Sequence, residues 1–190
     1  MLFCHQFDEE TPLEETIRAM EDLIRQGKIL YWGTCGWSAS QLYEVHSLTQ
    51  RLNGYAPIVE QPLYNLFERG IEYELMPTVR SLGMGLMTWS PLAGGVLSGA
   101  LQSPSALDQI SEERRRWVSP WLNEESSAQV KAMAVVAQEL GCTMSQLALA
   151  WSLRRREVST VMMGVSTESQ LQENLKALEL NIPQNIWDQL

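Results

Sequence analysis

Basic residues are scarce in this sequence. Its 14 Lys and Arg residues are outnumbered by 23 Asp and Glu residues, which gives a formal net charge of −9 at pH 7. Nucleic-acid binding needs clustered cations, so this balance argues against a nucleic-acid partner. One basic run exists at residues 114–116, directly after two glutamates. It is either the solvent-exposed face of a helix or a contact for a phosphate.

Residues that bind metals or form disulfides are also few. The cysteines, Cys4, Cys35 and Cys142, are odd in number and show no CxxC spacing. This pattern fits a reducing compartment and predicts neither a disulfide framework nor a metal site. The two histidines are too few for a histidine-rich zinc site.

Long hydrophobic runs are missing as well. No uninterrupted apolar run reaches the roughly 18 residues that a membrane-spanning helix requires. Residues 1–7 have neither the basic start nor the cleavage pattern of a signal peptide. We therefore expect no direct membrane insertion. The apolar fraction of 45% in 190 residues is enough for the core of one domain.

Strand and helix periodicities alternate along the chain. Strands are expected at residues 1–7, 28–34, 57–61, 85–90 and 158–163. Helices are expected at residues 13–26, 38–52, 70–82, 124–140, 143–155, 167–178 and 181–190. Residues 91–123 are expected to be irregular. Because strands alternate with helices and hairpin signals are missing, we expect an α/β fold with five parallel strands.

Several of these helices carry start and stop signals. Thr11, Ser38 and Thr143 each stand where a hydroxyl side chain can accept a hydrogen bond from an N–H of the first turn. Gly27 and Gly141 stand where a helix is expected to end.

Residues 164–174 form a possible anion-binding turn. They follow a β-branched apolar run and present a glycine, a hydroxyl cap and an amphipathic helix in that order. Such a turn directs backbone N–H groups and the positive end of a helix dipole at one point. This segment is the clearest indication of a phosphate-bearing ligand.

Other candidates stand at the carboxyl ends of strands, where parallel α/β folds bind their ligands. His5 is either a general acid or oxyanion donor, or an inert histidine. Gln61 either anchors an amide or caps a loop, and Trp89 either stacks on a flat ring or belongs to the core. Residues 94–95 are glycines, which could let the backbone approach a pyrophosphate but are also common in loops.

Several longer motifs follow one another at family-like spacing. They stand at residues 4–8, 11–20, 31–34, 37–38, 60–61, 87–93, 140–151 and 170–174. Together they resemble the aldo-keto reductase family, in particular the beta subunits of voltage-gated potassium channels and their plant and bacterial homologues. The resemblance starts at the family's fourth βα unit and covers essentially the whole chain.

The resemblance implies a TIM barrel that binds NADPH or NADP⁺ and transfers hydride to a carbonyl. Gln61 would hold the nicotinamide carboxamide, and Trp89 would stack on the nicotinamide. The pyrophosphate and adenosine contacts would come from Ser90, Leu92, Gly94, Gly164, Ser166, Gln170, Glu173 and Asn174. His5 matches the last member of the family's catalytic Asp-Tyr-Lys-His set.

The sequence also departs from the family pattern. The first three βα units, which carry the catalytic Asp, Tyr and Lys, have no counterpart in it. Cys35 and Gly36 replace residues that usually help to hold the carboxamide, and Ala100 stands where relatives often have lysine. A Tyr- and Arg-containing loop is not clearly present at residues 101–121.

We therefore interpret residues 1–190 as one aldo-keto reductase domain that is truncated at its N-terminus, in other words a partial TIM (β/α)8 barrel. Five strands cannot close a barrel of eight. The first and fifth strands are expected to be unpaired edges, and the isolated chain is expected to be poorly stable.

Three functions remain open. In the first, the chain belongs to an NADPH-binding accessory subunit that docks, as a homotetramer, on the cytosolic domain of a potassium channel alpha subunit. Alternatively it belongs to a soluble NADPH-dependent carbonyl reductase of the plant or bacterial type, or it is a fragment without a function of its own. A cytoplasmic location is expected, peripheral to the plasma membrane only through a channel partner.

Overall fold

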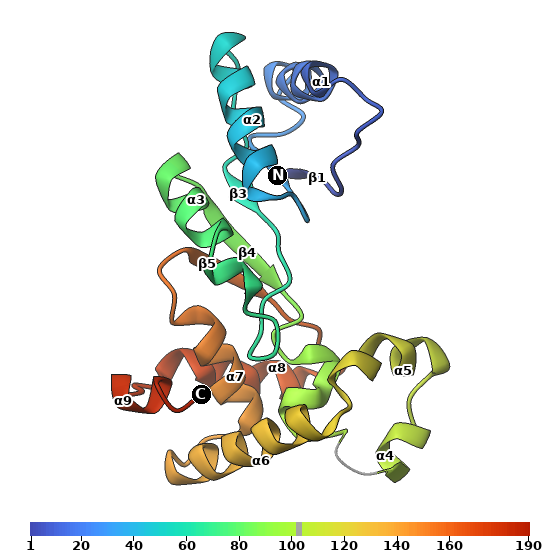
Figure 1. Cartoon of the computed structure of the whole chain (residues 1–190), viewed down its shortest axis with the longest axis vertical. Helices are drawn as coiled ribbons and strands as arrows, with labels where there is room; N and C mark the ends of the chain where they lie inside the picture. The colour runs from blue at the N-terminus through green and yellow to red at the C-terminus, as the bar shows by residue number, and fades with distance from the viewer. Residues whose placement is uncertain (102–103) are drawn as a thin grey trace. The chain divides into compact units, whose positions relative to one another are not determined.

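The computed structural model describes residues 1–101 and 104–190, and these divide into two compact units (Figure 1). The sheet unit consists of Met1–Leu63, Gly70–Thr88 and Arg156–Thr160. The helical unit consists of Tyr64–Arg69, Trp89–Arg155 and Val161–Leu190.

One five-stranded sheet follows the order of the sequence. Its strands are β1 (Leu2–Cys4), β2 (Trp32–Thr34), β3 (Val59–Glu60), β4 (Gly85–Trp89) and β5 (Val158–Met162). The β1–β2, β2–β3 and β3–β4 pairs are parallel. The expected α/β fold is thereby confirmed, and it is consistent with part of a TIM barrel. As expected, β1 and β5 are the edges of the described sheet.

Three α-helices accompany the strands of the sheet unit. The helical elements of this unit are α1 (Leu13–Arg25), α2 (Ala39–Arg51), η1 (Gly70–Glu72) and α3 (Leu75–Leu82). Helix α2 contacts both α1 and α3 (Figure 1). Their apolar faces bury Ile17, Leu42 and Val79 completely, and Trp32 of β2 is also fully buried.

Strand β2, which lies between β1 and β3, needs a glycine. A Cβ atom at Gly33 would lie 2.5 Å from Val59 Cγ1, 2.7 Å from Val59 O and 2.9 Å from Phe3 Cε1. Since Phe3 belongs to β1 and Val59 to β3, Gly33 permits the close packing on both sides of β2.

The helical unit is built around α7. Its helical elements are η2 (Ala93–Ser98), α4 (Pro104–Asp108), α5 (Glu112–Val118), η3 (Ser119–Trp121), α6 (Glu124–Glu139), α7 (Met144–Leu153), α8 (Glu168–Leu175), η4 (Lys176–Glu179) and α9 (Gln184–Trp187). Helix α7 contacts α6, α8, η2 and η4. It is apolar around most of its circumference, and Leu147 and Trp151 are completely buried. No helix among the described residues is both long and apolar enough to cross a membrane.

Two of the three helix caps are confirmed. The hydroxyl oxygens of Ser38 and Thr143 accept hydrogen bonds from Gln41 N at 3.3 Å and Gln146 N at 3.1 Å. The cap at Thr11 is wrong, because α1 has Pro12 at its N-cap position. Pro12 has an extended backbone, so the helix begins one residue later than a cap at Thr11 requires, and the Thr11 hydroxyl donates to Asp8 Oδ2 at 2.7 Å.

Several expected segments differ from the structure, and the helix at residues 167–178 is one of them, because it is divided into α8 and η4. The strand at residues 1–7 is shorter, and Leu2 is 39% exposed, because β2 is the only described strand beside β1. The helix at residues 70–82 is divided into η1 and α3. Residues 91–123 are not simply irregular, since they contain η2, α4, α5 and η3. Residues 102–103 of that segment lie outside the described part.

Candidate functional site

A cavity of about 590 Å³ lies within the helical unit. Its walls come from the β4–η2 segment, α5, the start of α7 and the β5–α8 segment. The lining residues are Ser90, Pro91, Leu92, Gly94, Gly95, Ser98, Ala100, Arg114, Trp117, Ser145, Met162, Met163, Gly164, Ser166, Gln170 and Asn174. Its volume is typical of small-molecule and cofactor sites. We call it the glycine cavity.

Most of the candidate cofactor residues meet at this cavity although they lie far apart in the sequence. Those that line it are Ser90, Leu92, Gly94, Gly164, Ser166, Gln170 and Asn174. The other three candidates do not line it. Glu173 bonds to neighbouring side chains, Trp89 stacks on another tryptophan, and Gln61 belongs to the sheet unit.

The β5–α8 turn has the cap that its sequence predicts. The Thr167 hydroxyl accepts a hydrogen bond from Gln170 N at 3.2 Å. The backbone N–H of Ser166 donates to Gln170 Oε1 at 2.8 Å, so this N–H already has a partner. A Cβ atom at Gly164 would meet no atom within 4 Å, which leaves the backbone accessible from the cavity. The turn therefore offers an open backbone at Gly164 and polar side chains at Ser166 and Gln170.

Left-handed backbone conformations concentrate in the β4–η2 segment of the cavity wall. Ser90 and Ala93 have φ values of 55° and 47°, and Gly94 and Gly95 have values of 64° and 103°. Residues other than glycine rarely adopt this region, and such strain is common at functional sites. A tight turn results, in which Ala93 N donates to Ser90 O at 3.0 Å.

The glycine pair accommodates helix α5. A Cβ atom at Gly94 would lie 2.5 Å from Val118 Cγ1 and 3.2 Å from Trp117 Cδ1. A Cβ atom at Gly95 would lie 2.9 Å from Arg114 Nη2. Packing within the helical unit therefore requires small residues at positions 94 and 95, whether or not a ligand also approaches their backbone.

Arg114 differs from the other two arginines of its run. Its Nε and Nη2 atoms donate to Gly94 O at 3.3 and 2.8 Å, and its side chain lines the cavity. Arg115 pairs with Asp108 at 3.2 Å, and Arg116 pairs with Glu112 on the outer side of α5. The interpretation as a solvent-exposed helix face fits Arg115 and Arg116, whereas Arg114 brings a positive charge to the cavity.

Aromatic rings continue from the cavity wall. Trp117 lines the cavity and stacks on Trp89 with ring centroids 5.6 Å apart and planes inclined by 27°. Trp117 also meets Trp121 edge-on at 5.5 Å. Trp89, expected to contact a nicotinamide ring, therefore has an aromatic neighbour within the protein.

Hydrogen bonds fix the end of α8 beside the cavity. Gln146 Nε2 donates to Glu173 O at 2.9 Å and to Glu173 Oε1 at 2.8 Å. Lys176 Nζ donates to Glu173 Oε2 at 2.7 Å, and this hydrogen bond lowers the pKa of Glu173. Glu173 of α8 is thus an anion held by side chains of α7 and η4, next to the buried Asn174.

The remaining candidates lie in the sheet unit. His5 follows β1 and is exposed. Gln61 Nε2 donates to Met87 Sδ at 3.6 Å. Its neighbour Glu60 is buried, and burial raises the pKa of that carboxyl. The described residues contain no group of three or more His, Cys, Asp or Glu side chains that could hold a metal ion.

Sequence reasoning missed Trp117 and Ser145 as residues of the cavity, and it left open whether the run that contains Arg114 contacts a phosphate. The arginine run was visible, but its spacing does not reveal which arginine turns inward. That choice depends on α5 packing against Gly94 and Gly95, which are distant from it in sequence.

Comparison with known proteins agrees with these observations. The chain is 42% identical over 184 residues to a "Probable voltage-gated potassium channel subunit beta" of Arabidopsis thaliana. It is 41% identical over 184 residues to a protein of the same description from Oryza sativa subsp. japonica. Each match covers 95% of this chain and 56% of the relative, so the chain spans little more than half the length of these relatives. The profile of the Aldo/keto reductase family matches residues 1–190, and the chain belongs to this family.

Proposed function

We propose that the chain forms the pyrophosphate and adenosine part of an NADPH site in an aldo-keto reductase-type domain. One observation carries the proposal. Residues that the family pattern assigns to NADPH come from two distant segments, residues 90–94 and 164–174, and line one cavity. Family membership raises the expectation of a nicotinamide dinucleotide.

The lining of the cavity suits a phosphate-bearing ligand. Arg114 supplies a cation, and its two donors to Gly94 O could be redirected to a phosphate. Ser90 and Ser166 carry hydroxyl groups, and Gln170 and Asn174 carry amides that can bind a ribose or an adenine ring. The open backbone at Gly164 would permit close approach of the ligand.

Bound NADPH would supply a hydride to a carbonyl substrate in the whole protein. We assign Gln61 and Trp89 to the nicotinamide end and Glu173 to the adenosine end of this site, and His5 to the catalytic set. The family's Asp, Tyr and Lys have no counterpart in these 190 residues, so this chain is proposed to bind the cofactor rather than to reduce carbonyls alone.

Titration of NADPH fluorescence against the full chain tests this function. Arg114→Met should weaken NADPH binding about tenfold, because it removes a charged donor from the phosphate site. Arg116→Met is the matched control, since Arg116 pairs with Glu112 instead and should leave the affinity unchanged. Binding should weaken with salt in the parent and less so in Arg114→Met.

Two results would contradict the proposal. If the parent chain produces no change in NADPH fluorescence at high micromolar concentration, the cofactor function is wrong. If Arg114→Met and Arg116→Met bind alike, the site does not use Arg114. Aldehyde-dependent NADPH oxidation by the chain would show that the missing catalytic residues are dispensable.

An accessory role at a potassium channel is the second candidate, because both relatives carry the description of a channel beta subunit. In this case the domain acts in the cytoplasm as a homotetramer and reaches the plasma membrane only by binding the cytosolic domain of a channel alpha subunit. Co-purification with such a domain, together with the mass of the complex in solution, tests it. A chain that reduces carbonyls and does not retain the channel domain would favour the soluble reductase.

A further inference from the structure

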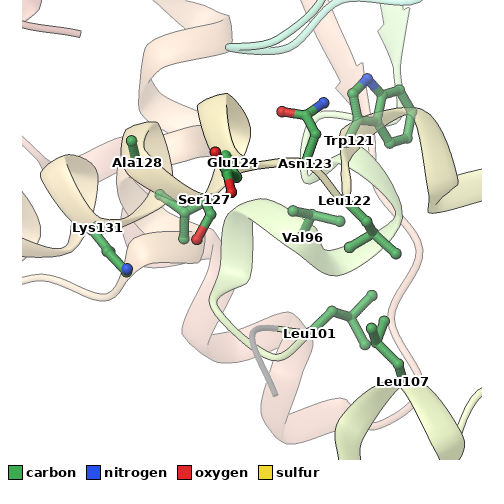
Figure 2. Close-up of a pocket in the computed structure, with 11 residues that line it drawn as sticks. Val96, Leu101, Leu107, Trp121, Leu122, Asn123, Glu124, Ser127, Ala128 and Lys131 are labelled. Carbon is green, nitrogen blue, oxygen red and sulfur yellow. The ribbon is translucent and has the colours of Figure 1, made fainter. Parts of the chain in front are cut away.

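A second cavity of about 540 Å³ lies within the helical unit (Figure 2). It shares no lining residue with the glycine cavity and is lined by Val96, Leu101, Leu107, Trp121, Leu122, Asn123, Glu124, Ser127, Ala128, Val130 and Lys131. We call it the α6 cavity. None of these residues has a role in the proposed NADPH site, so a ligand here would be independent of that function.

The floor of the α6 cavity is apolar. Val96, Leu101, Trp121 and Val130 line it and are at most 6% exposed. The indole N–H of Trp121 donates to Glu68 Oε1 at 2.9 Å, so the polar atom of this ring has a partner. The floor therefore offers carbon surface, which binds an apolar group by removing it from water.

One face of α6 forms a polar rim over this floor. Glu124, Ser127 and Lys131 lie at positions i, i+3 and i+7 of the helix and all line the cavity. Their side chains are exposed, so the rim is open to solvent. An apolar floor below a charged, accessible rim is suited to an amphipathic molecule.

Lys131 is the cation of the rim and lies on the same cavity as the acidic Glu124. The helix positions three and four residues away carry Ser127, Ala128, Ala134 and Val135, none of which is acidic. Within the described residues, no hydrogen bond or ion pair engages its Nζ atom. Glu124, by contrast, stands in the first turn of α6, where the helix dipole stabilises its carboxylate. The rim therefore has a cation available for an anionic group.

We propose that the α6 cavity binds a small amphipathic carboxylate, with its carboxylate at Lys131 and its alkyl chain on the apolar floor. Figure 2 shows Lys131 at one end of the row of lining side chains and Leu101, Leu107 and Leu122 toward the other. A medium-chain fatty acid has this distribution of charge and apolar surface. The volume of the cavity falls within the range of small-molecule sites.

The test is isothermal titration calorimetry of the full chain with decanoate, below the concentration at which decanoate forms micelles. We expect saturable binding by the parent. Lys131→Met retains the apolar stem and removes the charge, and it should weaken decanoate binding about fivefold, as expected for a solvent-exposed ion pair. Lys28→Met makes the same change of charge at an exposed site outside the cavity and should bind like the parent.

A second variant tests the floor. Ala128→Phe places a large ring into the cavity from an exposed helix position and should weaken binding at least tenfold. Circular dichroism of each variant verifies that the helices are intact. Decylamine and 1-decanol, which have the same number of carbon atoms but no carboxylate, should bind more weakly than decanoate.

Three outcomes would overturn the proposal: no saturable heat with decanoate, equal affinity of the parent and Lys131→Met, or stronger binding of decylamine than of decanoate. Equal binding of decanoate and decanol would also overturn it, because the occupant would then be a neutral apolar group. NADPH affinity, measured separately, distinguishes these failures from a failure of the proposed cofactor function.

Discussion

The two units differ in the kind of polar group that they bury. The sheet unit buries the carboxylates of Glu21, Glu60 and Glu157, which are at most 7% exposed. The described part of the helical unit buries amides and hydroxyls and no charged side chain. These residues are Asn65, Ser126, Gln146, Ser152 and Asn174.

This difference has an energetic consequence. A buried carboxylate is stable only while it is paired or accepts hydrogen bonds, and burial raises the pKa of Glu60 in the folded chain above its unfolded value. A buried amide does not titrate. The stability of the sheet unit should therefore depend on pH, whereas the interior of the helical unit, which contains both cavities, should be insensitive to it.

The largest expected effect is the loss of close packing in the sheet unit. Gly33→Ala places a Cβ atom 2.7 Å from the backbone oxygen of Val59, which a rotation of side chains cannot relieve. We expect the free energy of unfolding to fall by about 3 kcal/mol or more, measured by urea denaturation followed by circular dichroism.

Gly27→Ala is the control for this prediction. Gly27 has a φ of 69°, and a Cβ atom there would meet nothing within 4 Å. Its substitution should cost only the strain of the left-handed backbone, about 1 kcal/mol. Equal losses in the two variants would contradict the steric explanation.

The next effect concerns the buried Glu60. Its Oε2 atom accepts from the Thr34 hydroxyl at 2.5 Å, and its Oε1 atom accepts from Trp37 N at 3.1 Å. Glu60→Leu removes both acceptors and leaves two buried donors without partners, so the free energy of unfolding should fall by about 2–3 kcal/mol.

Glu60→Gln tests the dependence on pH. Burial raises the pKa of Glu60, and the hydrogen bond from Thr34 offsets part of that rise. A raised pKa in the folded chain contributes stability that is full below about pH 4.3 and is lost as the pH rises through the folded-state pKa. The variant cannot titrate at this position. Relative to the parent, it should therefore become more stable from pH 4 to pH 8, and a constant difference would contradict this assignment.

Local patterns explain which parts of the fold could be predicted. The caps at Ser38 and Thr143 involve residues three apart, so the sequence contains all the partners. The cap predicted at Thr11 was wrong because α1 begins one residue later, with Pro12 at its N-cap position. The five strands followed from apolar runs, but the exposure of β1 depends on its place at the edge of the sheet.

Long-range packing explains which parts of the site could not be predicted. The resemblance to the family identified residues 90–94 and 164–174, and the structure brings both segments to one cavity. Trp117 was missed, and the role of Arg114 stayed open, because their place depends on the packing of α5 against Gly94. Glu60 and Thr34 are partners across β2 and β3, and that register is set by the whole sheet. Cofactor binding by the cavity residues stays a prediction until it is measured.

A smaller effect is expected when a buried amide of the helical unit is removed. Gln146→Leu breaks the hydrogen bonds to Glu173 O and Glu173 Oε1 and should lower the free energy of unfolding by about 1–2 kcal/mol. Glu173 titrates, but its pKa is lowered in the folded chain, so it stays ionised and the loss should be the same from pH 5 to pH 8. A loss that varies over this range would mean that the proposed contrast between the two units is wrong.

The smallest effect belongs to His46 of the sheet unit. Burial lowers the pKa of this imidazole, although the hydrogen bond between Nε2 and Pro57 O, 3.1 Å long, acts in the opposite direction. A lowered pKa contributes stability that is present above about pH 6.5 and is lost as the pH falls through the folded-state value. His46→Gln should therefore gain stability relative to the parent as the pH falls from 7.5 to 5.5. Glu60→Gln, by contrast, should gain stability relative to the parent as the pH rises. Urea denaturation of both variants across this range measures the two slopes. If they share a sign, burial does not control the titration of the sheet unit.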